Sequence, residues 1–405
     1  MPKLLQINIS AGRGSTGHIA ETIASLATTR GWDCFLAHGA RYVGKTQMTA
    51  YQVTSRVGEC LHYLKSLLFD SHGLGSRKAT KRFVSWIKEL SPDVIQIHNI
   101  HGSWLNYEVL FGYLRVSGIP VVWTFHDCWP ITGHCALIPS YYCDKWKTGC
   151  RNCSALDQYP KSLFFDRSRR NYSKKEALFS SVPNMTVVTV SYWLQGIVSQ
   201  SFLKGVPLKV INNGIDTGVF YPRDNAVPGI KARYGLEGKV VVLSVADKWN
   251  EGVGFSDIPR LRALLDNRFI IMLVGVTQSQ KEALPDGIVG ILHTSNRDEL
   301  AELYSAADIT FMSQTIATFG LVCVESMACG TPAVVYAPAA AEIMGKNGFV
   351  VPPRDIRQLA DTIKQFYESG GKAMYRESCI RRVKDQYEEK VNFNRYIDLY
   401  NSLIH

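Results

Sequence analysis

Short apolar runs alternate with longer stretches of helical periodicity along almost the whole chain, and this alternation restricts the fold more than any other feature. In the first half, the runs KLLQINI, DVIQIHNI, PVVWTFHD and MTVVTVS are typical of buried strands. The stretches HIAETIASLATTRG and SRKATKRFVSWIKEL have the spacing of amphipathic helices. Strands that alternate with helices form a parallel sheet with helices on both faces. The first half therefore predicts a doubly wound α/β domain.

The same alternation begins again in the second half. KVVVLSVA, FIIMLVG, IVGILHTS, ITFMSQ and PAVVYA predict strands, and DELAELYSAA and LVCVESMACG predict helices. The Pro- and Gly-rich segment VFYPRDNAVPG between the two series is typical of a linker. We therefore predict an N-terminal domain over 1–221 and a C-terminal domain over 222–385. A final helix over 386–405 has no partner strand and is expected to return to the first domain.

The charge balance favours anionic partners. The 405 residues carry a net charge of +10, and basic residues gather at 77–82 and again at 167–175. No zinc-finger spacing and no aromatic-interleaved basic pattern indicates a nucleic-acid partner. No apolar run approaches the ~20 residues that span a bilayer, and the N-terminus resembles a first strand more than a signal peptide. We expect a cytoplasmic protein.

Cysteines crowd into a predicted insert of the first domain, residues 128–153. The spacing Cys135-x7-Cys143-x6-Cys150-x2-Cys153 offers four sulfur ligands, and a closing Cys-x-x-Cys pair suits a tetrahedral structural zinc. Disulfides are not expected in the cytoplasm. The alternative is a set of free thiols in a loop.

Polar and glycine-rich segments follow several of the predicted strands. In open parallel sheets, ligands bind beyond the carboxyl ends of the strands, so two such sheets predict a cleft between domains. Gly14 and Ser15 lie between the first strand and a helix, where backbone amides can approach an anion. His126 and Asp127 follow PVVWTF, and a histidine there can donate to a hydroxyl or carbonyl oxygen. The alternatives are an ordinary tight turn and a structural histidine.

The segment TFGLVCVESMACGTP is the most specific of these features. Gly320 stands at a predicted strand-to-helix turn, which exposes backbone N–H groups to phosphates. Glu325 lies one turn into the helix and can bind the vicinal hydroxyls of a ribose. A buried helix with a glycine stop is the alternative.

The order and spacing of these segments resemble the family-4 retaining glycosyltransferases of the GT-B fold. The similarity covers nearly the whole chain and is closest to the bacterial polysaccharide branch of colanic-acid or exopolysaccharide type. Its marks are GSTG, HDCWxxTGHC, NGID and ESMACGTP, all present here. The resemblance implies two Rossmann-like domains facing across a cleft. It also implies transfer of a sugar from a UDP- or GDP-sugar to a glycan or lipid-linked glycan, with retention and without a catalytic metal.

The resemblance also implies roles for individual residues. Glu325 corresponds to the glutamate that binds the donor ribose, and His126, with Asp127 beside it, to the histidine that contacts the donor sugar. His293 and Thr294 correspond to the loop that holds the base. The remaining positions of the donor site correspond to Gly14, Ser15, Lys248, Phe319, Gly320 and Leu321.

Three positions depart from the family pattern. Ala317 stands where the family has a second glutamate, and Gly252 and Val253 stand where it has an Arg and a Lys for the leaving diphosphate. Such cations usually contribute much of the transition-state stabilisation, and Lys248 is the nearest substitute. Two hypotheses follow: an active transferase with altered donor contacts, or a degenerate GT-B protein that binds nucleotide or glycan without turnover. A lipid-linked acceptor and the basic clusters add peripheral contact with the inner membrane as a further hypothesis.

Overall fold

The computed structural model describes residues 1–138 and 143–404, so four residues of the predicted cysteine-rich insert lie outside the description. The chain divides into two compact units. The first unit comprises Met1–Asn212 together with Phe393–His405, and the second comprises Asn213–Asn392. No described helix combines the length and apolar character needed to cross a membrane.

The first unit is built on a parallel sheet of seven strands in the order β5-β3-β1-β6-β7-β8-β9. Every neighbouring pair is parallel, so all the carboxyl ends lie at one edge. Two short strands, β2 and β4, pair with each other beside it. The bounds are β1 Lys3–Ile7, β2 Ser10–Ala11, β3 Asp33–His38, β4 Tyr42–Val43, β5 Thr49–Gln52, β6 Val94–Ile97, β7 Val121–Phe125, β8 Met185–Thr189 and β9 Leu208–Val210.

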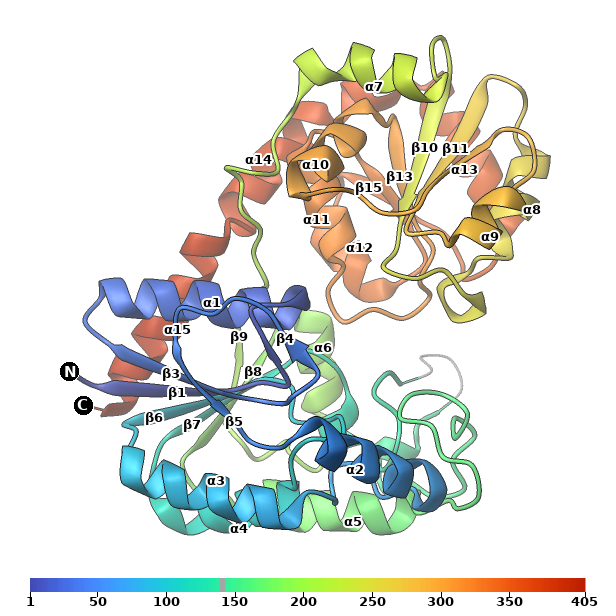
Figure 1. The fold of residues 1–405 in the computed structure, drawn as a ribbon. Helices are drawn as coiled ribbons and strands as arrows, with labels where there is room; N and C mark the ends of the chain where they lie inside the picture. Colours follow the sequence, from blue (N-terminus) through green and yellow to red (C-terminus); the bar gives the residue numbers. More distant parts are fainter. Residues whose placement is uncertain (139–142, 405) are drawn as a thin grey trace. The chain divides into compact units, whose positions relative to one another are not determined.

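Helices cover both faces of this sheet. Figure 1 shows α1 and α15 on one face and α3, α4 and α5 on the other. The bounds are α1 Gly14–Thr29, α2 Arg56–Phe69, α3 Arg77–Leu90, α4 Tyr107–Ser117, α5 Ser168–Phe179, α6 Tyr192–Val198 and α15 Glu389–Ile404. The sequence predicted α1, α3 and α15, whereas α2 was missed because its apolar residues are largely exposed.

The helix α15 returns to the first unit and completes its core. Phe393, Tyr396 and Tyr400 are buried in one cluster with residues of β1, β3 and α1. The Tyr396 hydroxyl lies 3.0 Å from the Thr124 hydroxyl, and the Tyr400 hydroxyl donates to Gln96 Oε1 at 3.0 Å. Buried tyrosines of this kind need a polar partner, and two strands of the sheet supply it.

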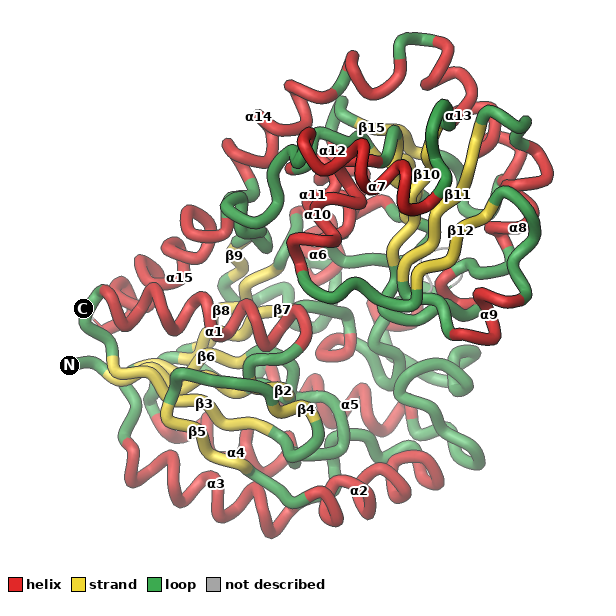
Figure 2. The backbone as a smooth tube through the Cα atoms, turned by 45° about the horizontal axis from the view of Figure 1, so that its top comes forward, coloured by secondary structure: helices red, strands yellow, loops and turns green. Residues whose placement is uncertain are grey.

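The second unit is a parallel sheet of six strands in the order β12-β11-β10-β13-β14-β15, which Figure 2 shows as yellow segments among red helices. Its strands are β10 Val240–Val245, β11 Phe269–Val274, β12 Ile288–Ile291, β13 Ile309–Met312, β14 Ala333–Val335 and β15 Gly348–Val350. Its helices are α7 Val227–Tyr234, α8 Asp257–Leu264, α9 Gln278–Glu282, α10 Arg297–Ala306, α11 Leu321–Ala328, α12 Pro338–Met344, α13 Ile356–Glu368 and α14 Arg376–Gln386.

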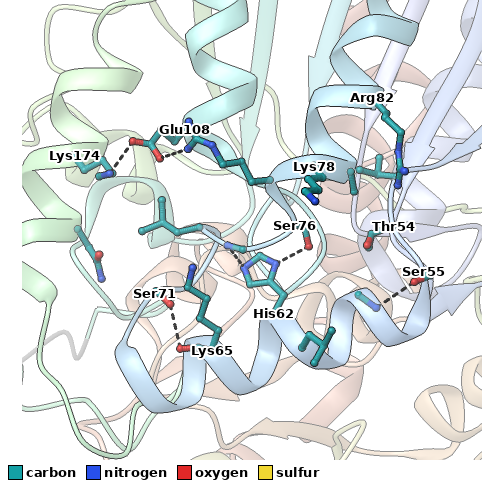
Figure 3. Close-up of a pocket in the computed structure, with 18 of the residues that line it drawn as sticks. Thr54, Ser55, His62, Lys65, Ser71, Ser76, Lys78, Arg82, Glu108 and Lys174 are labelled. Atoms are coloured by element: carbon teal, nitrogen blue, oxygen red, sulfur yellow. Dashed lines mark hydrogen bonds and ion pairs between the residues drawn. The ribbon is translucent and has the colours of Figure 1, made fainter.

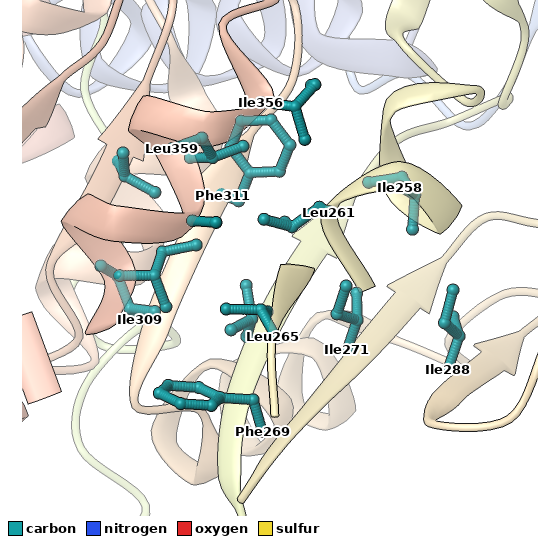
Figure 4. Packing of buried hydrophobic residues seen from close by; sticks show 14 of the residues in the cluster. Ile258, Leu261, Leu265, Phe269, Ile271, Ile288, Ile309, Phe311, Ile356 and Leu359 are labelled. Carbon is teal, nitrogen blue, oxygen red and sulfur yellow. The ribbon is translucent and has the colours of Figure 1, made fainter. Parts of the chain in front are cut away.

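An aliphatic and aromatic core holds the second unit together. Figure 4 shows Leu261 of α8 and Leu359 of α13 packed with Phe311 of β13. All three side chains are fully buried. Since each buried side chain of this size stabilises the fold by about 1.5–3 kcal/mol, this cluster gives the second unit a core of its own.

The predicted linker differs from the structure. The chain divides at Asn212–Asn213, before the predicted boundary at Tyr221, because Ile215 pairs with Glu388 within the second unit. Part of the segment VFYPRDNAVPG is also helical: α7 begins at Val227 with a proline in its first turn. Proline suits that position because its missing N–H would have no partner there in any case.

Candidate functional site

Histidines from neighbouring strands meet at the carboxyl edge of the first sheet. His98 follows β6 and His126 follows β7, and their rings stack with centroids 5.4 Å apart. His98 Nδ1 lies 3.1 Å from His126 Nε2, and His98 Nε2 lies 2.9 Å from Oε1 of Gln6 on β1. Side chains of three adjacent strands therefore form one hydrogen-bonded row, His126–His98–Gln6. The sequence pointed to His126 but not to Gln6.

The bonding pattern settles which ring nitrogens carry protons. The Gln6 amide nitrogen donates to the Ala20 carbonyl at 2.8 Å, so Gln6 Oε1 is the acceptor toward His98 Nε2–H. His98 Nδ1 is then an acceptor, and His126 must donate from Nε2. Burial lowers the pKa of His126 to about 4, and burial followed by the neighbouring His126 lowers that of His98. Both rings are therefore neutral at pH 7.

Asp127 is held as a carboxylate beside this pair. Its Oδ2 lies 2.6 Å from His101 Nε2, and its Oδ1 accepts from the Trp129 backbone N–H at 2.8 Å. Burial opposes its charge, but His101 and the Trp129 amide outweigh burial and lower the pKa of Asp127. On the far side of the ring, His101 Nδ1 lies 3.0 Å from the Tyr159 hydroxyl. The edge thus combines an ionised carboxylate with a neutral histidine.

The loop between β1 and α1 presents backbone rather than side chains. A side chain on Gly12 would have its Cβ 1.8 Å from the Lys45 carbonyl oxygen, so only glycine fits there. The space around Gly14 is open, with no heavy atom within 4 Å of a built Cβ. Ser15 is exposed, and α1 begins without a side-chain cap or an acidic residue in its first turn. Such a helix start leaves N–H groups that favour an anion.

In the second unit, the segment that follows β13 contains the start of α11 and the carboxylate of Glu325. Gly320 adopts a φ of 112° and precedes α11, whose start has neither a side-chain cap nor an acidic residue in its first turn. Glu325 lies one turn inside α11, and the buried Tyr304 hydroxyl donates to its Oε2 at 3.0 Å. Phe319 is buried and Leu321 is half-buried beside Gly320.

The other predicted residues of the second unit follow neighbouring strands. His293 and Thr294 come after β12, Lys248 comes after β10, and Ala317 comes after β13. Because the sheet is parallel, all of these segments leave its carboxyl edge. His293 and Lys248 are exposed, whereas Ala317 and Thr294 are half-buried.

Two family models match these two units. The model for Glycosyltransferase Family 4 matches residues 14–219, and the model for Glycosyl transferases group 1 matches residues 258–386. The chain belongs to the family 4 glycosyltransferases. The first match contains the histidine edge and the second contains Glu325, so the family assignment covers both parts of the site.

Relatives of known structure share the fold of this glycosyltransferase. A sucrose-phosphate synthase from Thermosynechococcus elongatus matches with a TM-score of 0.72 and 16% identity, over 100% of this chain and 99% of that one. HepE of Anabaena in complex with UDP matches with a TM-score of 0.68 and 16% identity, over 99% and 100% of the two chains. Both are GT-B proteins, and the transferase has that fold of two Rossmann-like sheets.

A curated relative spans the same length. WcaC of Escherichia coli (strain K12), a glycosyl transferase assigned to colanic acid biosynthesis, is 21% identical over 99% of this chain and 100% of its own. A D-inositol 3-phosphate glycosyltransferase from Mycobacterium sp. (strain KMS) is 27% identical over 42% of this chain and 41% of its own length. Together with the family models, these matches identify the transferase as an enzyme.

A cation that the sequence did not point to lies beside the departures from the family pattern. Gly252 and Val253 lie in a 3₁₀ turn, Glu251–Val253. Arg354, about 100 residues later in the chain, donates to the Glu251 carbonyl at 2.8 Å and pairs with the buried carboxylate of Asp257 at 2.9 Å. No local motif marks Arg354, since only the folded sheet brings it to this turn.

The cysteine-rich insert does not form the expected metal centre with its described side chains. Over residues 1–138 and 143–404, no group of three or more His, Cys, Asp or Glu side chains is arranged to hold a metal ion. All four cysteines are free thiols, and burial raises the pKa of Cys135 to about 12 and that of Cys150 to about 11. His134, next to Cys135 in the chain, contacts Asp70 at 2.6 Å. The thiols of Cys143, Cys150 and Cys153 nevertheless help to raise the pKa of Cys135, so the four sulfur atoms lie near one another and the zinc site stays a prediction.

A cavity of about 350 Å³ lies beside the histidine edge. Tyr63, Tyr159 and the buried residues Ser66 and His72 line it. The Gly102 amide donates to His72 Nε2 at 3.0 Å, so the neutral ring carries its proton on Nδ1. Among the described residues, neither His72 Nδ1 nor Ser66 Oγ has a hydrogen-bond partner. Since buried polar atoms are nearly always paired, these two atoms fit a ligand with hydroxyl groups.

Proposed function

We propose that the protein transfers a sugar from a UDP- or GDP-sugar to a glycan or lipid-linked glycan acceptor, with retention of anomeric configuration, in bacterial polysaccharide synthesis. The full-length similarity to the colanic acid transferase WcaC supports the polysaccharide role. Structures of HepE from Anabaena in complex with UDP and with UDP-glucose support a nucleotide-sugar donor.

Glu325 is the observation that carries this proposal. A carboxylate accepts hydrogen bonds from both hydroxyls of a ribose, which is the contact that selects a nucleoside. The bond from the Tyr304 hydroxyl to Oε2 orients the Glu325 side chain before any donor arrives. The uncapped start of α11 at Gly320 adds backbone donors for the diphosphate of the same molecule.

The first unit is proposed to act on the donor sugar and the acceptor. The His126 ring, which His98 orients, contacts a hydroxyl of the donor sugar and thereby positions the reacting carbon. The open backbone at Gly14 and Ser15 approaches the diphosphate. The cavity with Tyr63, Tyr159 and His72 takes the acceptor, because aromatic faces and unpaired polar atoms together suit a sugar ring.

The leaving diphosphate needs positive charge nearby. We propose that Lys248 and Arg354 supply it, in place of the Arg and Lys that the family usually has at positions 252 and 253. Lys248 is exposed and lies four residues before Gly252. Arg354 is attached to the same turn through the Glu251 carbonyl. Cations placed where charge develops lower the barrier most in a site that excludes water. Of the two hypotheses raised by Ala317, Gly252 and Val253, the active transferase is the one that the family matches favour, and none of them favours the inactive alternative.

Membrane contact is part of the same proposal. On α2, Val57 is 70% and Leu61 is 64% exposed, and Phe164, which lies shortly before α5, is 73% exposed. Exposed apolar side chains beside basic residues suit the surface of an anionic leaflet. Sedimentation with phosphatidylglycerol vesicles, comparing wild type with Val57→Ser/Phe164→Ser, tests this contact. Equal recovery of both proteins with the vesicles would count against it.

Calorimetric titration with UDP, GDP and ADP, followed by donor hydrolysis and sugar transfer with the one that binds, tests the function. We expect one nucleotide to bind the wild type and the Glu325→Gln variant to lose that affinity. Glu282→Gln, an exposed carboxylate on α9, is the matched control and should bind as wild type does. Nucleotide binding without any turnover would support the alternative of an inactive GT-B protein. If none of UDP, GDP and ADP binds, the proposed donor class is wrong.

A further inference from the structure

A second, larger cavity lies on the other side of α2 and shares no lining residue with the first. Its volume is about 860 Å³. The end of β5, α2, the segment 71–76, α3 and α5 all contribute to its wall. Figure 3 shows Lys174 and Glu108 on one side of it and Ser55 and Arg82 on the other. None of its residues belongs to the donor or acceptor sites proposed above.

The wall of this cavity is strongly basic. Among the described lining residues are seven lysine or arginine side chains and one carboxylate. That carboxylate, Glu108, is already bound: Lys174 contacts it at 2.8 Å and Arg77 at 3.0 Å. Within the described part of the chain, the remaining cations Lys65, Lys78, Arg82 and Arg170 make no ion pair, and Arg167 lies over two phenylalanine rings. The excess positive charge has no acidic partner in the wall.

The helix start at the cavity adds to this charge. The helix α3 begins with Arg77 and Lys78, with no acidic residue in its first turn and no side-chain cap. Its N-cap residue Ser76 instead contacts the buried His62, whose Nδ1 lies 3.0 Å from the Ser76 hydroxyl. A helix N-terminus favours negative charge, so two cations there oppose the helix dipole unless an anion lies between them. The two cations are therefore more stable at this helix start when an anion is bound than when none is bound.

One buried atom indicates what else the ligand carries. Asn171 lines the cavity and is only 4% exposed. Its amide nitrogen donates to the Asp70 carbonyl at 2.8 Å, which leaves Oδ1 as an acceptor, and Oδ1 has no partner among the described residues. Such an atom is costly to leave unpaired, and a hydroxyl group is the donor that fits it.

We propose that this basic cavity binds a phosphate-bearing ligand with at least one hydroxyl group, held by Lys78, Arg82 and the first amides of α3. A phosphorylated sugar in solution and the headgroup of a phospholipid share this chemistry. The proposal does not depend on the donor site in the second unit, since every lining residue belongs to the first.

Calorimetric titration of the full chain with inorganic pyrophosphate, in the presence of saturating UDP, tests the site. UDP is included so that any diphosphate site in the second unit is occupied, and its own binding is measured separately. We expect pyrophosphate to bind the wild type, more weakly as salt rises, and its Kd to increase by about tenfold or more in Lys78→Gln/Arg82→Gln. Lys81→Gln, an exposed cation on the same helix outside the cavity wall, is the control and should leave the Kd unchanged.

Two further titrations distinguish the sources of phosphate. Glycerol phosphate represents a soluble ligand, and phosphatidylglycerol vesicles represent a membrane one. Loss of either interaction in Lys78→Gln/Arg82→Gln, but not in Lys81→Gln, supports the site and names its ligand. If pyrophosphate does not bind the wild type, or if Lys81→Gln weakens it as much as the double variant, the proposal is wrong.

Discussion

The carboxyl edges of the two sheets present different chemical groups. In the first unit, the edge is a network of side chains in which His98, His126 and Gln6 are hydrogen-bonded and Asp127 is paired. In the second unit, the edge includes the start of α11 at Gly320 and the carboxylate of Glu325, which accepts a hydrogen bond from the Tyr304 hydroxyl. One sheet therefore positions acids and bases, and the other presents amides and one carboxylate.

This difference follows from what each edge has to hold. Neutral histidines must be kept neutral by burial and must be oriented by partners, and the first unit buries His62, His72 and His98. A diphosphate can be held by amides at helix starts, which need glycine more than charge. The comparison predicts that low pH destabilises mainly the first unit and that removing a side chain of its edge lowers turnover. It also predicts that nucleotide affinity depends on the second unit.

Acidification should produce the largest effect. Burial lowers the pKa of His62 and of His126 to about 4, and it lowers the pKa of His72 and His98 as well. Below pH ~6.5 the unfolded chain takes up these protons and the folded chain does not, so stability is complete above pH ~6.5 and is lost as the pH falls toward 4. At pH 5, a histidine with a pKa of 4 costs about 2 kcal/mol.

Thermal unfolding followed by tryptophan fluorescence measures this loss. Seven of the eight tryptophans lie in the first unit and only Trp249 lies in the second, so the signal reports the unit with the histidines. We expect the fluorescence-detected Tm to fall steeply between pH 7 and pH 5. A Tm that is constant over this range would show that the histidines are not buried as neutral groups.

His126→Ala should cause the next largest effect, on turnover alone. Removing one preorganised group typically lowers the rate by ~10²–10³-fold. Because His126 is proposed to contact the sugar and not the nucleotide, the Kd for UDP should stay as in wild type. Initial rates of transfer and a UDP titration on the same preparation check both parts. Equal losses in rate and in UDP affinity would show that His126 also contributes to nucleotide binding, contrary to the proposed division of roles between the two edges.

Glu325→Gln should show the opposite pattern. A hydrogen bond to a charged group contributes about 1.5–3 kcal/mol, which corresponds to about 10- to 100-fold in nucleotide affinity. Tyr304→Phe removes the orienting hydroxyl but keeps the carboxylate, so its effect should be smaller. Calorimetry with the preferred nucleotide measures both variants. A larger loss in Tyr304→Phe than in Glu325→Gln would show that the tyrosine, and not the carboxylate, contacts the ligand.

Val253→Lys is expected to give the smallest effect, and a gain. It returns a cation to the turn where the family usually has one, and a partly exposed charge is worth up to about 1 kcal/mol, or about two- to fivefold in UDP affinity. The gain should shrink at high salt. Val253→Gln is the uncharged control. An unchanged Kd in the lysine variant would indicate that Arg354 already supplies the charge at this turn.

Much of the fold and part of the site could be predicted from local sequence. Gly320 and Glu325 could be proposed from local sequence because both lie in one strand-to-helix segment, Gly320 directly before α11 and Glu325 within it, and their roles stay predictions. The helix α2 was missed because its exposed Leu61 and Leu64 blur the apolar periodicity. The zinc hypothesis came from the spacing of four cysteines, and it stays a prediction because spacing does not give the geometry of the four sulfur atoms.

The sequence by itself determined two series of strands and helices, the glycines at two helix starts, and the carboxylate at Glu325, because these depend on backbone preferences and periodicity within a few residues. Only the tertiary structure decided that Gln6 sets the proton positions of His98 and His126, that Arg354 lies at the Glu251 carbonyl, and that cations from α2, α3 and α5 surround one cavity. Parallel strand order and helix packing bring these groups together across tens to hundreds of residues, and no local pattern records which distant side chains will meet.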